Sequence, residues 1–156
     1  MTTKSSRNAV LVAGWANVDF VVRASHVPAP GETVLGRELG TYPGGKGANQ
    51  AVASARAGGA PTRMLLALGE DSFAKYLEDS LVSVAVELHN LCVPGEATGV
   101  ALICLSDDAQ NAITVAPGAN AKLRASELPR LEDVAILLLQ LETPLDAVTR
   151  KARAAR

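Results

Sequence analysis

Continuous apolar runs recur along this chain and predict buried strands. They cover residues 9–13, 63–68 and 134–139, and a less regular run covers 84–91. Short runs without alternation are typical of strands that are buried on both faces of a parallel sheet. All of them are far shorter than the roughly 20 apolar residues that a membrane-spanning helix needs. We therefore expect the core of a globular fold.

Helical segments alternate with these strands. The expected helices cover residues 47–57, 73–81, 126–131 and a last segment that opens at Thr143-Pro144. The first consists of small residues and ends before a glycine pair at 58–59, which is a common helix stop. Ser72 is the expected N-cap of the second. This succession of strands and helices predicts an α/β fold with a doubly wound, mostly parallel sheet.

Other segments alternate polar and apolar residues and predict a second, half-exposed sheet. These segments are residues 17–22, 33–39, 99–105 and 112–115. The polar stretch 106–110 lies between the last two and favours a hairpin. We expect the strands within about 17–42 and 99–115 to form a small antiparallel β lid inserted in the α/β core.

Composition and charge leave a small molecule as the expected partner. The 156 residues suit one domain, and 15 Lys and Arg against 16 Asp and Glu give a net charge of -1. No overall field then favours nucleic acid or an anionic membrane. Cys92 and Cys104 lack the spacing of a metal or redox site, so both are expected to be core residues. The polar start of the chain does not fit a signal peptide, and we expect a cytoplasmic protein.

The most specific motif is the glycine-rich segment Gly44-Gly45-Lys46-Gly47-Ala48-Asn49 at the start of the first helix. Bare glycine backbone, the Lys46 ammonium and the Asn49 amide could together bind a polyol through directional hydrogen bonds. Residues 40–46 also satisfy the phosphate-loop pattern G-x-x-x-x-G-K. That interpretation is disfavoured because Gly47 replaces the Ser or Thr that binds magnesium. A glycine-rich helix start without any ligand is the third alternative.

Three further polar residues flank predicted core strands. Asn17 and Asp19 share one face of a strand that follows the first apolar run, and Glu142 follows the run 134–139. Open α/β sheets bind ligands at the carboxyl ends of their strands, and a carboxylate can accept hydrogen bonds from two vicinal hydroxyls. A turn or cap role for Asn17 and Asp19, and a helix-dipole role for Glu142, remain as alternatives.

Several of these segments together resemble the ribokinase family of carbohydrate kinases over essentially the whole chain. The matching stretches are Gly14-Trp15-Ala16-Asn17-Val18-Asp19, Pro30-Gly31-Glu32-Thr33, Gly44 to Ala53, Gly69-Glu70-Asp71, Thr98 to Ala101, Gly118-Ala119-Asn120 and Gln140-Leu141-Glu142-Thr143-Pro144.

The resemblance implies a D-ribose site and a phosphotransferase that makes ribose 5-phosphate. By it, the ribose-binding residues would be Asn17, Asp19, Gly45, Lys46, Asn49 and Glu142, with Gly44 in the same loop and Ala101 and Ile103 lining the sugar from the lid. The lid would also pair with a second subunit in a homodimer. A lid that closes would exclude water from phosphoryl transfer.

The resemblance also implies parts that this sequence does not contain. The family's second signature, Gly-Ala-Gly-Asp with its catalytic aspartate, has no counterpart, so no catalytic residue and no metal ligand is assigned. Residues 1–156 are expected to be the amino-terminal part of one domain, with the sites for ATP, Mg²⁺ and K⁺ beyond Arg156. The chain alone is then expected to be inactive. Two alternatives are a non-catalytic sugar-binding or dimerisation module and a kinase for another pentose.

Overall fold

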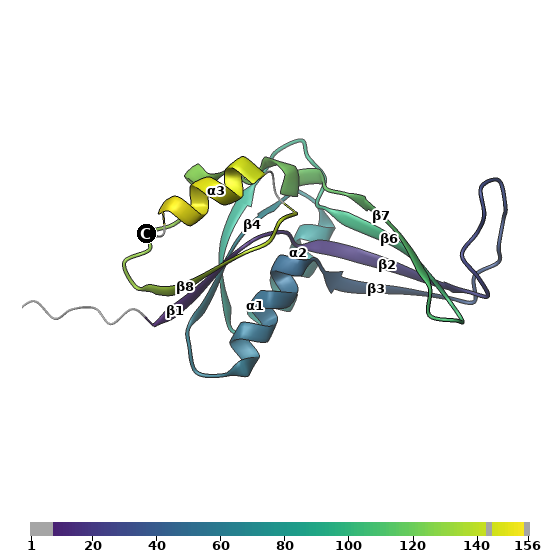
Figure 1. Ribbon diagram of the computed structural model, residues 1–156, viewed down its shortest axis with the longest axis horizontal. Helices are drawn as coiled ribbons and strands as arrows, with labels where there is room; N and C mark the ends of the chain where they lie inside the picture. The colour runs from purple at the N-terminus through teal and green to yellow at the C-terminus, as the bar shows by residue number, and fades with distance from the viewer. Residues whose placement is uncertain (1–7, 143–144, 155–156) are drawn as a thin grey trace, which may run out of the picture.

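The computed structural model describes residues 8–142 and 145–154, and its centre is a parallel sheet (Figure 1). This core sheet has the strand order β5-β4-β1-β8. Its strands are β1 (Ala9–Ala13), β4 (Thr62–Leu68), β5 (Val86–Cys92) and β8 (Val134–Leu139). All three strand pairs are parallel, as the continuous apolar runs predict.

Helices cover both faces of the core sheet. The helices α1 (Lys46–Ala57) and α2 (Ser72–Val82) pack on the face that carries Met64 and Leu66. The opposite face carries Leu11 and Leu65 and is covered by the 3₁₀ helix η1 (Gly118–Lys122). A second turn, η2 (Ala125–Glu127), and α3 (Leu145–Ala154) lie on this side too, because α3 contacts both η2 and β8. The doubly wound α/β prediction is confirmed.

A second sheet, for which we keep the name lid, projects from the core (Figure 1). Its strand order is β3-β2-β6-β7, with β2 (Asn17–Ala24), β3 (Glu38–Gly44), β6 (Val100–Ser106) and β7 (Asn111–Ala116). The pairs β2–β3 and β6–β7 are antiparallel, but β2 and β6 are parallel. The purely antiparallel prediction is therefore wrong. Since β2 and β6 follow the carboxyl ends of two parallel core strands, both leave the core in the same direction.

Two local predictions fail for identifiable reasons. A strand was expected over 33–39, but β3 starts only at Glu38, and Leu35 is 88% exposed. Glu38 pairs with Arg23, which is the second-last residue of β2. The residues before Glu38 therefore have almost no part of β2 left to pair with. The helix expected over 126–131 is only the 3₁₀ turn η2, because Pro129 cannot continue a helix.

Smaller differences concern caps and cysteines. Asp71, not Ser72, caps α2, and its carboxylate accepts a hydrogen bond from Ala74 N at 3.0 Å. Cys92 is exposed on β5 rather than part of the core, and Cys104 is half-buried. The Thr143-Pro144 helix start lies outside the described residues. None of the described helices is long and apolar enough to cross a membrane.

Candidate functional site

The candidate site lies where the lid joins the core sheet, at the carboxyl end of β1. The turn 14–16 connects β1 to β2, and α1 begins against it, with Ala48 N donating to Trp15 O at 3.0 Å. A Cβ on Gly47 would lie 2.7 Å from the backbone of Gly14 and Trp15. Only glycine lets the start of α1 approach the turn so closely.

Gly44 and Gly45 leave bare backbone at this point. Gly45 has φ +90°, and a Cβ there would lie 2.8 Å from Trp15 O and 2.9 Å from the Ala16 Cα. A Cβ on Gly44 would lie 2.0 Å from Asp19 Oδ2. The Asp19 carboxylate therefore lies directly over Gly44, and the structure brings these predicted residues together.

Asp19 lies in the middle of the lid's base, between two strands. It pairs with Tyr42 on β3 and with Ala101 on β6, and Ala101 is buried. Burial, and secondarily the nearby Glu142 carboxylate, raise the pKa of Asp19 above its ordinary value. Asp19 and Glu142 are therefore close enough to repel each other.

Lys46, the first residue of α1, forms an ion pair with the carboxylate of Glu142. Lys46 Nζ lies 2.5 Å from Glu142 Oε1, across 96 residues of sequence. The other carboxylate oxygen, Glu142 Oε2, is buried and has no hydrogen-bond partner among the described residues. The described residues thus leave the hydrogen bonding of this buried carboxylate oxygen unsatisfied.

Asn17 completes the cluster from the start of β2. Its side chain lies on the same strand face as Asp19 and is only 5% exposed. Its Oδ1 accepts a hydrogen bond from Asn120 Nδ2 on η1 at 2.9 Å. We call the set Asn17, Asp19, Gly44, Gly45, Lys46 and Glu142 the junction site.

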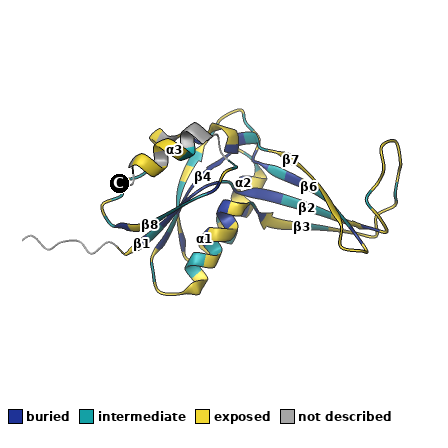
Figure 2. Cartoon of the chain, in the orientation of Figure 1, coloured by how far each residue is buried: buried dark blue, intermediate teal, exposed yellow. Residues whose placement is uncertain are grey.

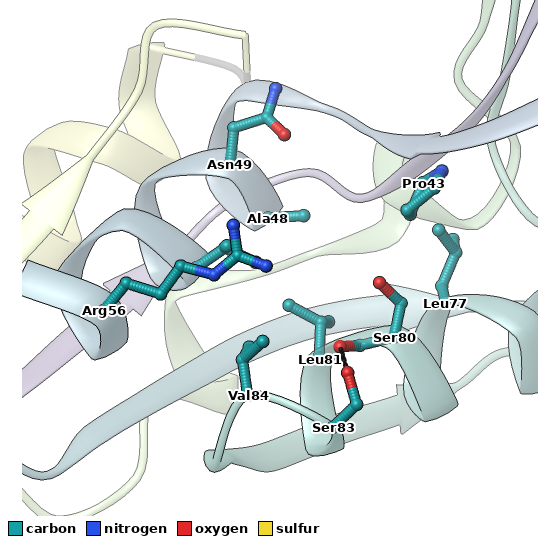
Figure 3. A pocket seen from close by; sticks show the side chains of 10 residues that line it. Pro43, Ala48, Asn49, Arg56, Leu77, Ser80, Leu81, Ser83 and Val84 are labelled. Carbon is teal, nitrogen blue, oxygen red and sulfur yellow. Dashed lines mark hydrogen bonds between the residues drawn. The ribbon is translucent and has the colours of Figure 1, made fainter.

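Two predicted residues lie farther from this cluster. Asn49 is exposed in the first turn of α1 and lines a groove of about 210 Å³ between α1 and α2. In Figure 3 it lies beside Ala48, and its amide points away from the α2 side chains Ser80 and Leu81 on the other side of the groove. Ile103 is half-buried on β6, two residues farther out along the lid than Ala101. That any of these residues binds a sugar stays a prediction.

The phosphate-loop alternative is not supported by the backbone. Residues 40–44 belong to the extended strand β3 and pair with β2, from Val21 with Gly40 to Asn17 with Gly44. A phosphate loop instead wraps its amides around an anion. No group of three or more potential metal ligands occurs in the part of the chain that the structure describes.

Asn120 is a residue of this region to which the sequence analysis assigned no role. It is completely buried and binds the turn 14–16 through its side-chain amide. Its only sequence signal is its place in the Gly118-Ala119-Asn120 stretch.

Comparison with known proteins matches this chain to sugar kinases. The pfkB family carbohydrate kinase profile matches residues 7–155. A ribokinase of Lactococcus lactis is 38% identical over 139 residues, covering 86% of this chain and 46% of that protein. A ribokinase of Haemophilus influenzae is 36% identical over 156 residues, covering 96% of this chain and 50% of that protein.

Solved structures agree with these matches. Ribokinase from Thermotoga maritima superposes with a TM-score of 0.86 at 34% identity, covering 94% of this chain and 49% of that one. Arabidopsis thaliana ribokinase, determined in complex with ribose and ATP, gives 0.79 at 33% identity, covering 95% and 50%. The chain spans about half the length of the relatives it matches.

Proposed function

Because this chain belongs to the pfkB family of carbohydrate kinases, we propose that it is the sugar-binding half of a ribokinase. The whole enzyme transfers the γ-phosphoryl group of ATP to D-ribose and makes ribose 5-phosphate. Relatives named ribokinase, at 36–38% identity over most of this chain, support this assignment. The proposal includes no catalytic residue within the described chain.

The junction site is the observation that carries the proposal. It places two carboxylates, Asp19 and Glu142, and one ammonium group, Lys46, around the bare backbone of Gly44 and Gly45. Ionised carboxylates accept hydrogen bonds from hydroxyls, and Lys46 donates them. A polyol matches this mixture of donors and acceptors.

The lid has a second role in this proposal. Residues 1–156 form the amino-terminal part of one domain, and the lid strands within about 17–42 and 99–115 are inserted in its α/β core. Closing the lid over the sugar would exclude water from the reaction. The lid face opposite Asp19 carries the exposed side chains of Leu39 and Leu102, which support its use as the interface of a homodimer.

ATP, Mg²⁺ and K⁺ belong to the proposal for the whole enzyme. We assign the nucleotide and its ions to the other half of the enzyme, because the Gly-Ala-Gly-Asp signature of the family has no counterpart in this sequence. The isolated chain then lacks what phosphoryl transfer needs, because that reaction depends on positioning and on electrostatic stabilisation of the transferred group. A cytoplasmic location, where ATP is available, accompanies this proposal.

A chimera tests the kinase proposal directly. Residues 1–156 replace the matching half of the Haemophilus influenzae ribokinase, and ADP formation is followed with D-ribose, 2-deoxyribose and xylose. We expect D-ribose to be the preferred substrate and Asp19→Asn to abolish the activity. A folded chimera, verified by circular dichroism, that phosphorylates no pentose would refute the proposal.

The second candidate function is a sugar-binding module that works without chemistry. It is favoured by one observation, namely that Asp19, Lys46 and Glu142 all lie within this chain and meet without any other part. Calorimetry with the isolated chain tests it, since the module must bind D-ribose by itself. Lys46→Ala should weaken that binding and leave ATP binding undetectable, whereas the phosphate-loop alternative needs ATP binding that Lys46→Ala destroys.

A further inference from the structure

The amide of Asn120 is held in one orientation by the backbone of the turn. Asn120 Oδ1 accepts from Ala16 N at 3.2 Å, and Asn120 Nδ2 donates to Ala16 O at 2.9 Å. The backbone of Ala16 thus offers both a donor and an acceptor to the side-chain amide of Asn120. Exchanging the oxygen and nitrogen of Asn120 would set donor against donor and acceptor against acceptor.

This orientation determines that of Asn17. Asn120 Nδ2 also donates to Asn17 Oδ1 at 2.9 Å, so the atom of Asn17 that faces it must be the oxygen. The carbonyl of Asn17 is then already bonded. Its Nδ2 has no hydrogen-bond partner in the part of the chain that the structure describes.

The surrounding packing leaves little room for another arrangement. Asn120 is 0% exposed, and a Cβ on Gly99 would lie 2.2 Å from Asn120 Nδ2 and 2.6 Å from Asn17 Oδ1. The 3₁₀ helix η1 is itself fixed by a hydrogen bond from Ala119 N to Ala97 O at 2.8 Å. A flipped Asn17 amide would place two NH₂ groups against each other in a buried space.

We propose that Asn120 is a positioning residue that locks the Asn17 amide so that Asn17 presents its NH₂ group, and not its carbonyl, to the sugar. Asn17 and Asp19 lie on the same strand face, so a donor and an acceptor stand side by side. A sugar must then offer an acceptor oxygen to Asn17 and a donor hydroxyl to Asp19. This inference rests on the proposed sugar-binding function and adds the polarity of one contact to it.

The first test does not depend on the sugar. Side-chain NH₂ signals of the ¹⁵N-labelled chain are assigned with Asn17→Ser and Asn120→Ser, and their exchange with water is measured. Asn120 NH₂ should exchange slowly, because both of its protons are bonded, and Asn17 NH₂ should exchange fast. Slow exchange of Asn17 NH₂, or fast exchange of Asn120 NH₂, would overturn the inference.

The second test uses Asn120→Asp, which keeps the shape of the side chain. When ionised, the introduced carboxylate can only accept hydrogen bonds, so it should force Asn17 to turn its NH₂ away from the site. When protonated, it can again donate to Asn17 Oδ1. Burial at this position should raise the pKa of the introduced group.

We expect Asn120→Asp to weaken D-ribose binding roughly tenfold at pH 8 and to recover most of that loss at pH 5.5, measured by calorimetry. Asn120→Ala should weaken binding by a similar factor at both pH values. Asn111→Asp, the same change on the exposed strand β7, is the matched control and should bind as the original chain does. The charged residues of the neighbouring segments, namely Asp19, Asp71, Glu96 and Lys122, are the same in all four proteins, so the comparison cancels their effect.

The outcomes distinguish a failure of the positioning role of Asn120 from a failure of the proposed sugar binding. If Asn120→Asp lowers the melting temperature but binds D-ribose normally at pH 8, or loses binding equally at both pH values, Asn120 is merely structural and the inference fails. If the original chain binds no sugar, the module function fails, while the exchange rates still decide the orientation of Asn17.

Discussion

The core sheet and the lid are built from strands of similar length but differ in what they bury. Four of the five residues of β1 and six of the seven residues of β4 are buried, whereas β7 is exposed along its entire length. Figure 2 shows this contrast between β1 and β4, where buried residues dominate, and strands β3 and β7, where exposed residues dominate. The comparison indicates that β1 and β4 contribute far more buried surface to the stability of the chain than β7 does.

The junction site lies between these two regions, and each region contributes residues to it. Gly45 and Lys46 begin α1, which packs on the core sheet, while Asn17 and Asp19 belong to the lid strand β2. The site thus joins a helix on the core sheet to a lid whose outer strands β3 and β7 are mostly exposed. Such an arrangement suits a site that must open to admit a sugar and close to exclude water.

The largest effect is expected in the core sheet. Leu66 on β4 is 0% exposed, so Leu66→Ala should lower the free energy of unfolding by about 3 kcal/mol through lost burial and a residual cavity. Urea denaturation followed by circular dichroism measures this loss. A loss below about 1 kcal/mol would mean that the core sheet does not carry the stability.

The second effect concerns the junction site. Gly45 and Gly31 have similar positive φ angles, +90° and +82°, but only at Gly45 would a Cβ meet neighbouring atoms, whereas Gly31 has nothing within 4 Å. Gly45→Ala should cost about 2 kcal/mol and impair D-ribose binding, because strain and a steric clash add.

Gly31→Ala is the matched control for backbone strain alone. It should cost about 1 kcal/mol and leave sugar binding unchanged. Denaturation and calorimetry on both variants separate the two contributions, and equal costs would contradict the close approach of α1 to the turn.

These regions also differ in how well the sequence predicts them. The apolar runs predicted β1 and β8 with the observed bounds, because a short continuous apolar run is a local pattern, even though β8 itself is much less buried than β1. The parallel pairing of β2 with β6 joins residues about 80 positions apart, such as Val18 with Val100, and no local pattern encodes it. The first residue of β3 is set by where its partner strand β2 ends. This limit comes from strand pairing and not from the local sequence.

Predictions for the site show the same division. Asp19, Gly44, Gly45, Lys46 and Glu142 were found from their residue types and their places beside strand ends, and the structure brings them together. Asn120 was missed because its amide acts on Ala16 and Asn17, more than 100 residues away. Hydrogen bonds between a buried polar side chain and such distant partners leave no local pattern in a single sequence.

The third effect tests the charge at the junction site. The pKa of Asp19 is raised above its ordinary value of 3.8, so the folded chain holds this proton more tightly than the unfolded chain does. The stabilisation from the neutral carboxyl group is therefore present at lower pH and is lost as the pH rises through the raised pKa. At neutral pH the ionised Asp19 makes the fold less stable.

Asp19→Asn removes that charge while keeping the shape. We expect it to raise the melting temperature at pH 7 by about 2 °C at most, since the carboxylate is only partly withdrawn from water, and to have no such effect at pH 3.5. D-ribose binding should fall at least roughly tenfold in the same variant. A variant that is less stable at pH 7 would contradict the raised pKa.

The smallest effect on stability is expected at the outer part of the lid. Leu102 on β6 is 56% exposed, so Leu102→Ala should change the free energy of unfolding by less than about 0.5 kcal/mol, far less than Leu66→Ala in the core. Its effect should instead be on assembly, because we propose the lid face of Leu39 and Leu102 as the homodimer interface. Ile113→Ala is the control, since Ile113 is 53% exposed on the opposite face, paired with Ile103. Light scattering should show that only Leu102→Ala shifts dimer to monomer, and an equal response of both variants would exclude this face as the interface.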